Sequence, residues 1–314
     1  MASVTWWIVS RLTSLAHFAP PWTVFLSAAV ICVAVPAGAT AQTLDHIAAT
    51  KIVRIGYVAD QAPFASKDDS GAPVGYGIDI CRRIVGEIGK TTDGARADYV
   101  ELTLPEAFEA IAGGRVDLLC GAITTTLARR EIVDFSEPVF VTGASALLRS
   151  DSPRDLREFF MDERAISPPR SPELRPFAIS SVGVRSGTTT EASLRSAVAR
   201  EGYKISIVDF TTHLNGLAAL ESRDIDAYFA DRALLLELLR QARDPADLVV
   251  GTRLLTREPY AIALKRGDAD LRLLVDRALT NFYATADFPE LLAKYFGEAA
   301  VGMQAQILTL SVPN

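Results

Sequence analysis

The sequence predicts an α/β protein of two lobes, each a mainly parallel sheet flanked by helices, with two extended segments forming the hinge. Short apolar runs alternate with helical patterns along most of the 314 residues. Strand–helix–strand repetition of this kind indicates a mainly parallel sheet with helices on both faces. The alternation runs through two cycles, separated by the extended apolar segment 139–148. A second extended segment, 260–264, follows the second cycle.

The first cycle lies between residues 51 and 133. Ile80, Ile84 and Ile88 recur on one face of the segment 77–89, which predicts an amphipathic helix. Gly113-Gly114 is a typical stop for the helix that we expect over 105–112. The complete set of expected elements is strands 51–57, 98–102 and 116–123, and helices 77–89, 105–112 and 127–133.

The second cycle begins at Ser181, after a stretch rich in Pro, Arg and Ser. We expect that stretch, about 151–180, to be a surface insertion with one helical turn at 156–161. Strands are expected at 182–184, 205–208 and 225–229, and helices at 191–200, 214–220, 234–242 and from 269 to 296. The first lobe would then comprise 45–141 and 257–298, the second lobe 142–256, and residues 299–314 a tail without a packing partner.

Residues 1–41 have the composition of a cleavable secretory signal. They contain no Asp, Glu or Lys and a single Arg, followed by an almost wholly apolar run over 22–35. Small residues at Ala39 and Ala41 follow this run, as at a signal cleavage site. The run is short for a transmembrane helix, which needs about 20 apolar residues. We therefore expect export to the periplasm, with an uncleaved membrane anchor as the alternative.

Charge and cysteine content restrict the possible partners. The formal net charge is −6, which argues against nucleic acid as a partner. Cys81 and Cys120 both lie in apolar runs, so we expect buried free thiols; a disulfide is the alternative in an oxidising compartment. No Cys/His spacing suggests a metal site. A monomer without a cofactor is expected.

The first candidate site is the turn after the strand predicted at 116–123. Thr124 lies in this turn, and Arg129 lies one turn into the next helix. Exposed N–H groups at a helix start favour an anion, and a guanidinium group can bind a carboxylate through two hydrogen bonds. The alternative is a threonine-capped helix with a solvated arginine.

Two more candidates are the starts of helices in the second lobe. Thr188 and Glu191, within Ser186–Glu191, fit a capping box, and the same turn can accept an anion. Asp231 precedes an apolar helix, either as its N-cap or as an acceptor for an ammonium group. A carboxylate opposite Arg129 would match the two charges of a zwitterion.

His213 and Arg185 are the remaining candidates. A single histidine near a helix start is more often a capping or core residue than a ligand-binding group. Arg185 comes directly before the turn 186–191, so its side chain either faces a cleft between the lobes or is solvated.

Taken in order, these motifs resemble the family 3 solute-binding proteins of amino-acid ABC transporters. The resemblance covers about residues 50 to 298. It implies a type II periplasmic binding protein that is not an enzyme and that delivers its ligand to a membrane permease. The matching pieces are Ile55-Gly56-Tyr57, Ala62-Pro63-Phe64, Gly75–Asp79, Thr124–Arg129, Asp134-Phe135-Ser136, Ser186–Thr189, Asp226-Ala227 with Asp231, and Lys294–Gly297.

The resemblance also implies roles for individual residues. Arg129 would bind the α-carboxylate of the ligand, and Asp231 its α-ammonium group. Backbone and hydroxyl groups of four residues would complete the carboxylate site: Ala122, Thr124, Thr188 and Thr189. The most similar branch binds glutamate and aspartate, and the similarity includes Cys120-Gly121 and His213.

The side chain of the ligand depends on positions where this sequence departs from the family's branches. The branch for acidic ligands has arginines at the positions of Val58 and Ala107. The branch for cationic ligands has an aspartate at Val58 and aromatic residues at Gln61 and Leu104, so a lysine- or arginine-type ligand is not expected. Arg185 can supply a replacement cation. We therefore expect a small polar amino acid, preferably acidic or amide, with Arg185 and Gln61 among its contacts.

Two other classes of protein remain as alternatives. An enzyme on the same fold, similar to the cyclohexadienyl dehydratases, would use His213 and Asp231 as acid and base. A sensory input domain would continue into a membrane span and a signalling module. No such segment follows the second cycle, so we expect a free receptor.

Overall fold

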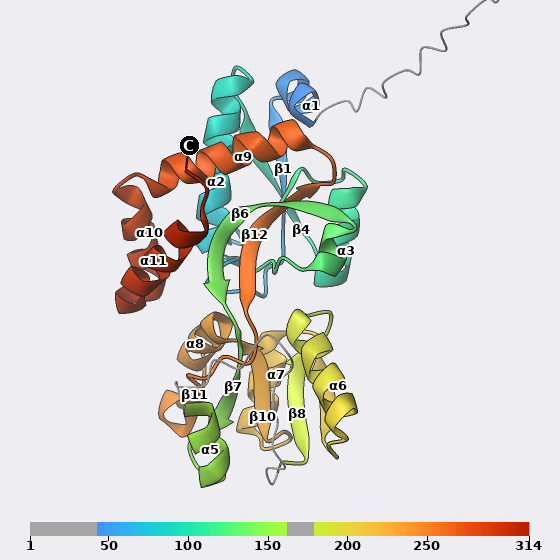
Figure 1. Cartoon of the computed structure of the whole chain (residues 1–314), viewed down its shortest axis with the longest axis vertical. Coiled ribbons are helices and arrows are strands. Elements are labelled where there is room, and N and C mark those ends of the chain that lie inside the picture. The colour runs from blue at the N-terminus through green and yellow to red at the C-terminus, as the bar shows by residue number, and fades with distance from the viewer. Residues whose placement is uncertain (1–42, 162–178, 314) are drawn as a thin grey trace, which may run out of the picture. The chain divides into compact units, whose positions relative to one another are not determined.

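A computed structural model describes residues 43–161 and 179–313 (Figure 1). The predicted signal, residues 1–41, lies outside the described residues, as does most of the predicted insertion 151–180. Its first part is the helix α5, Arg154–Met161. No helix in the described ranges is both long and apolar enough to cross a membrane.

The first sheet has five strands in the order β4-β1-β5-β12-β6. Strand β1 lies parallel to β4 and β5, whereas β12 is antiparallel to both β5 and β6. Successive residues of β5 point to opposite faces, so Leu118 packs in one core cluster and Leu119 in another. The strands are β1 Ile52–Tyr57, β4 Arg96–Glu101, β5 Leu118–Cys120, β6 Val133–Thr142 and β12 Glu258–Lys265.

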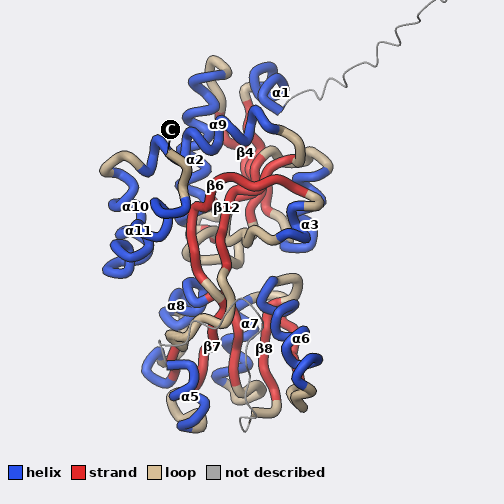
Figure 2. Tube along the Cα trace, in the orientation of Figure 1, coloured by secondary structure: helices blue, strands red, loops and turns tan. Residues whose placement is uncertain are grey.

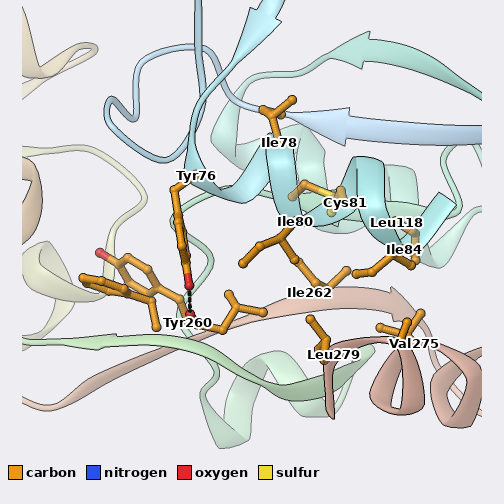
Figure 3. Close-up of a cluster of buried hydrophobic side chains, with 14 of the residues drawn as sticks. Tyr76, Ile78, Ile80, Cys81, Ile84, Leu118, Tyr260, Ile262, Val275 and Leu279 are labelled. Atoms are coloured by element: carbon orange, nitrogen blue, oxygen red, sulfur yellow. Dashed lines mark hydrogen bonds between the residues drawn. A yellow bond between two sulfur atoms is a disulfide. The ribbon is translucent and has the colours of Figure 1, made fainter. Parts of the chain in front are cut away.

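Helices cover both faces of this sheet. Ile80, Ile84 and Ile88 belong to the larger cluster, as the sequence pattern predicts; Figure 3 shows the first two. The helices of this lobe packed in that cluster are α1 Thr43–Thr50, α2 Tyr76–Thr91, α9 Ala269–Tyr283, α10 Asp287–Phe296 and α11 Ala300–Leu310; α8 Arg232–Arg240 adds Ala233 and Leu234, and α3 Leu104–Ala112 covers the other face.

The second sheet repeats this plan in the order β11-β7-β10-β8-β9. Strand β8 lies parallel to β10 and β9, and β7 is antiparallel to β10 and β11. Helices α5 and α6 pack on one face, and α7 and α8 on the other. The elements are β7 Ala144–Arg149, β8 Ser181–Arg185, α6 Thr189–Glu201, β9 Ser206–Phe210, α7 His213–Glu221, β10 Ala227–Asp231, α8 Arg232–Arg240, the short 3-10 helix η1 Pro245–Asp247 and β11 Leu248–Val250.

Strands β6 and β12 run side by side between the two sheets, where the sequence predicted a two-strand hinge (Figures 1 and 2). Strand β6 ends at Thr142 and β7 begins at Ala144, so Gly143 alone separates them. A Cβ atom at Gly143 would collide with the carbonyl oxygen of Thr256 on the returning strand. The close approach of the two backbones therefore requires a glycine at this position.

The predicted fold is confirmed, and the structure adds one detail and corrects two expectations. In each sheet one strand, β12 in the first and β7 in the second, runs opposite to the other four, so each sheet has two parallel and two antiparallel strand pairs. Cys81 and Cys120 form a disulfide between α2 and β5, with their Cα atoms 6.4 Å apart (Figure 3). The expectation of free thiols was wrong because α2 lies directly over β5. The tail has a packing partner: α11 buries Ala300 and Ile307 in the larger core.

The smallest elements shape the loops near the first sheet. Strands β2 Ser66–Lys67 and β3 Pro73–Val74 pair as a hairpin, and the short 3-10 helix η2 covers Gly297–Ala299. Helix α4 covers only Leu127–Arg130, because β6 already begins at Val133.

Candidate ligand-binding site

Arg129 is held in place by its own turn. Thr126 caps α4 by accepting a hydrogen bond from the Arg129 backbone N–H at 3.1 Å. The Arg129 side chain donates from Nη1 to the Thr124 carbonyl oxygen at 2.8 Å, and its guanidinium carbon lies 4.6 Å from the centroid of the Phe108 ring. Burial lowers the pKa of Arg129, and no ion pair among residues 43–161 and 179–313 includes it. A fixed, half-buried cation is thus available to an anion.

Asp231 is a buried carboxylate at the end of β10. It occupies the N-cap position of α8, but its side chain makes no capping hydrogen bond. Instead it accepts hydrogen bonds from the hydroxyl of Tyr260 and, at 3.5 Å, from that of Thr190. Burial, followed by the charge of Glu258, raises the pKa of Asp231 to about 7. The purely capping alternative for Asp231 is therefore wrong.

Glu258 is a second buried carboxylate, which the sequence analysis missed. It begins β12 and is only 4% exposed. Its Oε1 accepts a hydrogen bond from Thr256 at 2.8 Å, and its Oε2 accepts one from Thr189 at 3.0 Å. The available signal was a lone acidic residue at the start of the apolar run Pro259–Leu264.

These three charged groups interact without touching. The charges of Glu258 and Asp231 raise the pKa of Arg129 against the effect of burial, yet no ion pair joins either carboxylate to Arg129 within the described part of the chain. Withdrawing charged groups from water without pairing them is costly. The arrangement therefore suits a ligand that carries both a negative and a positive group.

Two threonines at the start of α6, Thr188 and Thr189, have separate partners. Thr188 caps the helix by accepting from the backbone N–H of Glu191 at 3.1 Å, and its hydroxyl donates to the Arg185 carbonyl oxygen at 2.8 Å. The Glu191 carboxylate accepts from the backbone N–H of Gly187, one residue before the expected capping-box donor. Thr189 donates to Glu258, so its hydroxyl reaches the acidic part of the site.

Gln61 and Ala122 form one structural unit. The Gln61 side chain accepts from the Ala122 backbone N–H at 3.0 Å, and it donates to the Ala122 carbonyl oxygen at 3.5 Å. Gly121, with a φ of 140°, brings the backbone close to Gln61. Thr124 is buried two residues further on and forms an isolated bridge with Tyr260. The Gln61 amide therefore stabilises the turn that contains Thr124 and leads to Arg129.

Arg185 and His213 meet at a different carboxylate, Asp60. Arg185 Nε lies 3.0 Å from Asp60 Oδ2 and donates to the Thr211 carbonyl oxygen at 3.3 Å. The same Asp60 oxygen accepts from the backbone N–H of His213 at 2.9 Å. Arg185 is 6% exposed, and its Nη1 has no hydrogen-bond partner among the described residues.

The His213 ring is buried and neutral. Its Nδ1 lies 2.9 Å from the Tyr228 hydroxyl. Burial, followed by the charge of Arg185, lowers the pKa of His213 to about 3. Within the described part of the chain no hydrogen bond, ion pair or ring contact joins His213 to Arg129 or Asp231, so His213 belongs with Asp60 and Arg185.

Comparison with known proteins identifies the family. The model for bacterial extracellular solute-binding proteins, family 3, matches residues 53–298. The chain is 27% identical over 272 residues to the L-glutamate/L-aspartate-binding protein of Pseudomonas aeruginosa, covering 86% of this chain and 84% of that protein. It is 24% identical over 258 residues to the ABC transporter glutamine-binding protein GlnH of Bacillus subtilis, covering 82% and 85%.

Solved structures share the fold. An ancestral amino-acid-binding protein described as a precursor of cyclohexadienyl dehydratase is 25% identical, with a TM-score of 0.66, and the match covers 81% of this chain and 99% of that one. A mutant of the arginine-binding protein of T. maritima is 25% identical, with a TM-score of 0.67 and the same coverage. The curated relatives are binding proteins of transport systems, in agreement with the expectation that this chain is not an enzyme. The chain belongs to the bacterial extracellular solute-binding proteins, family 3.

Proposed function

We propose that this protein is a monomeric periplasmic receptor that captures a small polar α-amino acid, preferably acidic or amide, and delivers it to the permease of an ABC transporter. The observation that carries the proposal is the half-buried cation Arg129 near the buried carboxylates Asp231 and Glu258, none of which forms an ion pair among the described residues. An α-carboxylate would bind Arg129 while the α-ammonium group meets the carboxylates. The family supports a transport role, and the names of the relatives support an amino acid as the cargo.

The preference for an acidic or amide side chain rests on Arg185. One of its terminal nitrogens, Nη1, is buried without a hydrogen-bond partner in the described ranges, while Nε lies 3.0 Å from Asp60. A buried donor without a partner is costly, so a ligand oxygen that reaches it would be favoured. The relatives named for glutamate, aspartate and glutamine are consistent with such a ligand.

A thermal-shift screen of the common amino acids, followed by calorimetry on the hits, tests this function. A ligand at about 100 times its Kd stabilises the form that it binds by about 2.7 kcal/mol. We expect glutamate, aspartate, glutamine or asparagine to give the largest shift. In the Arg185→Leu variant, the thermal shift given by the best acidic or amide ligand should fall more than the thermal shift given by alanine. Stabilisation by lysine or arginine alone would contradict the proposed preference, and no stabilisation by any amino acid would contradict the function.

The enzyme alternative gains no support from the site. It requires His213 as an acid or base, and this ring is buried against Tyr228 with its pKa far below neutrality. A general base works best with a pKa near the operating pH. Turnover of prephenate or arogenate by the purified protein would revive that alternative.

A further inference from the structure

Glu258 and Asp231 lie on either side of the point where the chain passes from one lobe to the other. In the strand register Glu258 is opposite Thr142, and Asp231 is opposite Ala144. Gly143, between these partners, accepts a hydrogen bond at its carbonyl oxygen from the backbone N–H of Arg232. Both carboxylates are thus fixed by backbone pairing rather than by flexible loops.

The hydrogen bonds of these carboxylates come from neutral groups. Glu258 accepts from the hydroxyls of Thr189 and Thr256, and Asp231 from those of Tyr260 and Thr190. Each carboxylate oxygen can accept more than one hydrogen bond, so acceptor capacity remains on both groups. No ion pair among the described residues neutralises either of them.

Among the described residues, three titratable or charged groups lie near this pair or begin the adjacent helix. Arg129 of α4 is the cation, and Tyr260 of β12 is a neutral hydroxyl because burial raises its pKa well above its usual value. Arg232, the first residue of α8, is directed elsewhere and donates to the Gly251 carbonyl oxygen at 3.1 Å. Two like charges that share one buried cation repel each other, and such a pair tends to retain a proton.

We propose that Glu258 is a second carboxylate of the ammonium subsite, and that Asp231, which lies beside Glu258, holds a proton in the empty site and releases it to solvent when the ammonium group of an amino acid binds. The inference rests on the proposed function. The O–H bond of the carboxylic acid breaks, its proton passes to water, and the ammonium group takes its place between the two oxygens. Proton and ligand therefore compete for the same pair.

The bound ligand favours loss of the proton because its ammonium group would lie closer to the two carboxylates than its own carboxylate would. The ammonium group would contact the carboxylates directly, whereas the α-carboxylate would be held at Arg129, and charge–charge energy falls with separation. Binding therefore favours the ionised pair. The raised pKa of Asp231, to which the charge of Glu258 contributes, agrees with a proton held near neutral pH. The helix starts at Thr189 and Arg232 place partial positive charge beside the ionised pair.

Calorimetry with L-glutamine and L-glutamate tests the inference, because neither side chain titrates between about pH 5.5 and 8.5. For the wild type we expect Kd to rise as pH falls below about 7, approaching tenfold per pH unit. Buffers of different ionisation enthalpy should report a released proton, approaching one per ligand near about pH 6.

Three variants separate charge from structure. Glu258→Gln removes the like charge while keeping the shape, so the midpoint of the pH dependence should move to lower pH. Thr190→Val removes a hydrogen-bond donor to ionised Asp231, so the midpoint should move to higher pH. Glu87→Gln changes an exposed carboxylate that pairs with Lys90, and it should behave like the wild type.

The outcomes distinguish the inference from the proposed function. A wild-type Kd that is constant over this pH range, or a Glu258→Gln variant with the wild-type midpoint, would overturn the inference and leave the receptor function intact. If neither probe nor any other common amino acid bound at about pH 8.5, where the pair is ionised, the receptor function itself would fall. Circular dichroism of each variant would show that a changed midpoint does not arise from misfolding.

Discussion

Removing the disulfide between Cys81 and Cys120 should cost this protein a large part of its stability. The bond closes a loop with a sequence separation of 39. Closing a loop of that length restricts the unfolded chain by about 4 kcal/mol. Both positions are fully buried in the larger core, so the double variant Cys81→Ala/Cys120→Ala also loses packing. We expect the free energy of unfolding to fall by about 4 to 5 kcal/mol.

Urea unfolding without reductant measures this change in the chain from residue 42 onward. The wild type unfolded in the presence of reductant serves as the matched control, because it loses the crosslink but keeps both sulfur atoms. Its loss should approach that of the double variant. A loss below about 1 kcal/mol in both cases would refute the loop-closure reasoning. Two free thiols in the denatured, unreduced protein would show that the bond is absent.

Two further predictions concern the second lobe. The pKa of His213 is lower in the folded protein than in the unfolded chain, so between these two values only the unfolded chain takes up a proton on this ring. The free energy of unfolding should therefore fall as the pH is lowered from about 6 to 3.5, by up to about 1.4 kcal/mol per pH unit. His213→Gln should show a shallower dependence in urea unfolding at several pH values, and an unchanged slope would count against a buried neutral ring. Gly216→Ala should destabilise by about 1 to 3 kcal/mol, because its Cβ would collide with the ring of Tyr228. A gain of about 1 kcal/mol, the helix propensity of alanine over glycine, would show that the collision is relieved.

The fold was largely accessible from local patterns. The spacing of Ile80, Ile84 and Ile88 predicted α2 and its buried face, and Gly113-Gly114 marked the end of α3. The reversed direction of β12 and β7 could not be predicted from local patterns, because it depends on how the chain crosses between the two lobes. The cysteine pairing depended in the same way on the packing of α2 over β5.

The candidate site was partly accessible for the same reason. Arg129 follows a strand end and Asp231 is the last residue of a strand, positions that the sequence pattern can identify; Arg129 is half-buried and Asp231 is buried. Glu258 lies at the start of an apolar strand whose sequence indicates only a buried core strand. Its position near Asp231 follows from the strand register. The ligand contact of Gln61 stays a prediction; the bond between its amide and Ala122 is a tertiary pairing that no local pattern predicts.

The central claim is that Arg129 binds the carboxylate of the ligand. Calorimetry of Arg129→Ala at about pH 8 should show affinity for the best amino acid lowered by about 2 to 5 kcal/mol, or roughly 30- to several-thousand-fold. Arg130→Ala is the matched control, because the neighbouring arginine is exposed on the same turn; it should bind like the wild type. Unchanged affinity in Arg129→Ala, with Arg130→Ala equally unaffected, would contradict the assignment of this site.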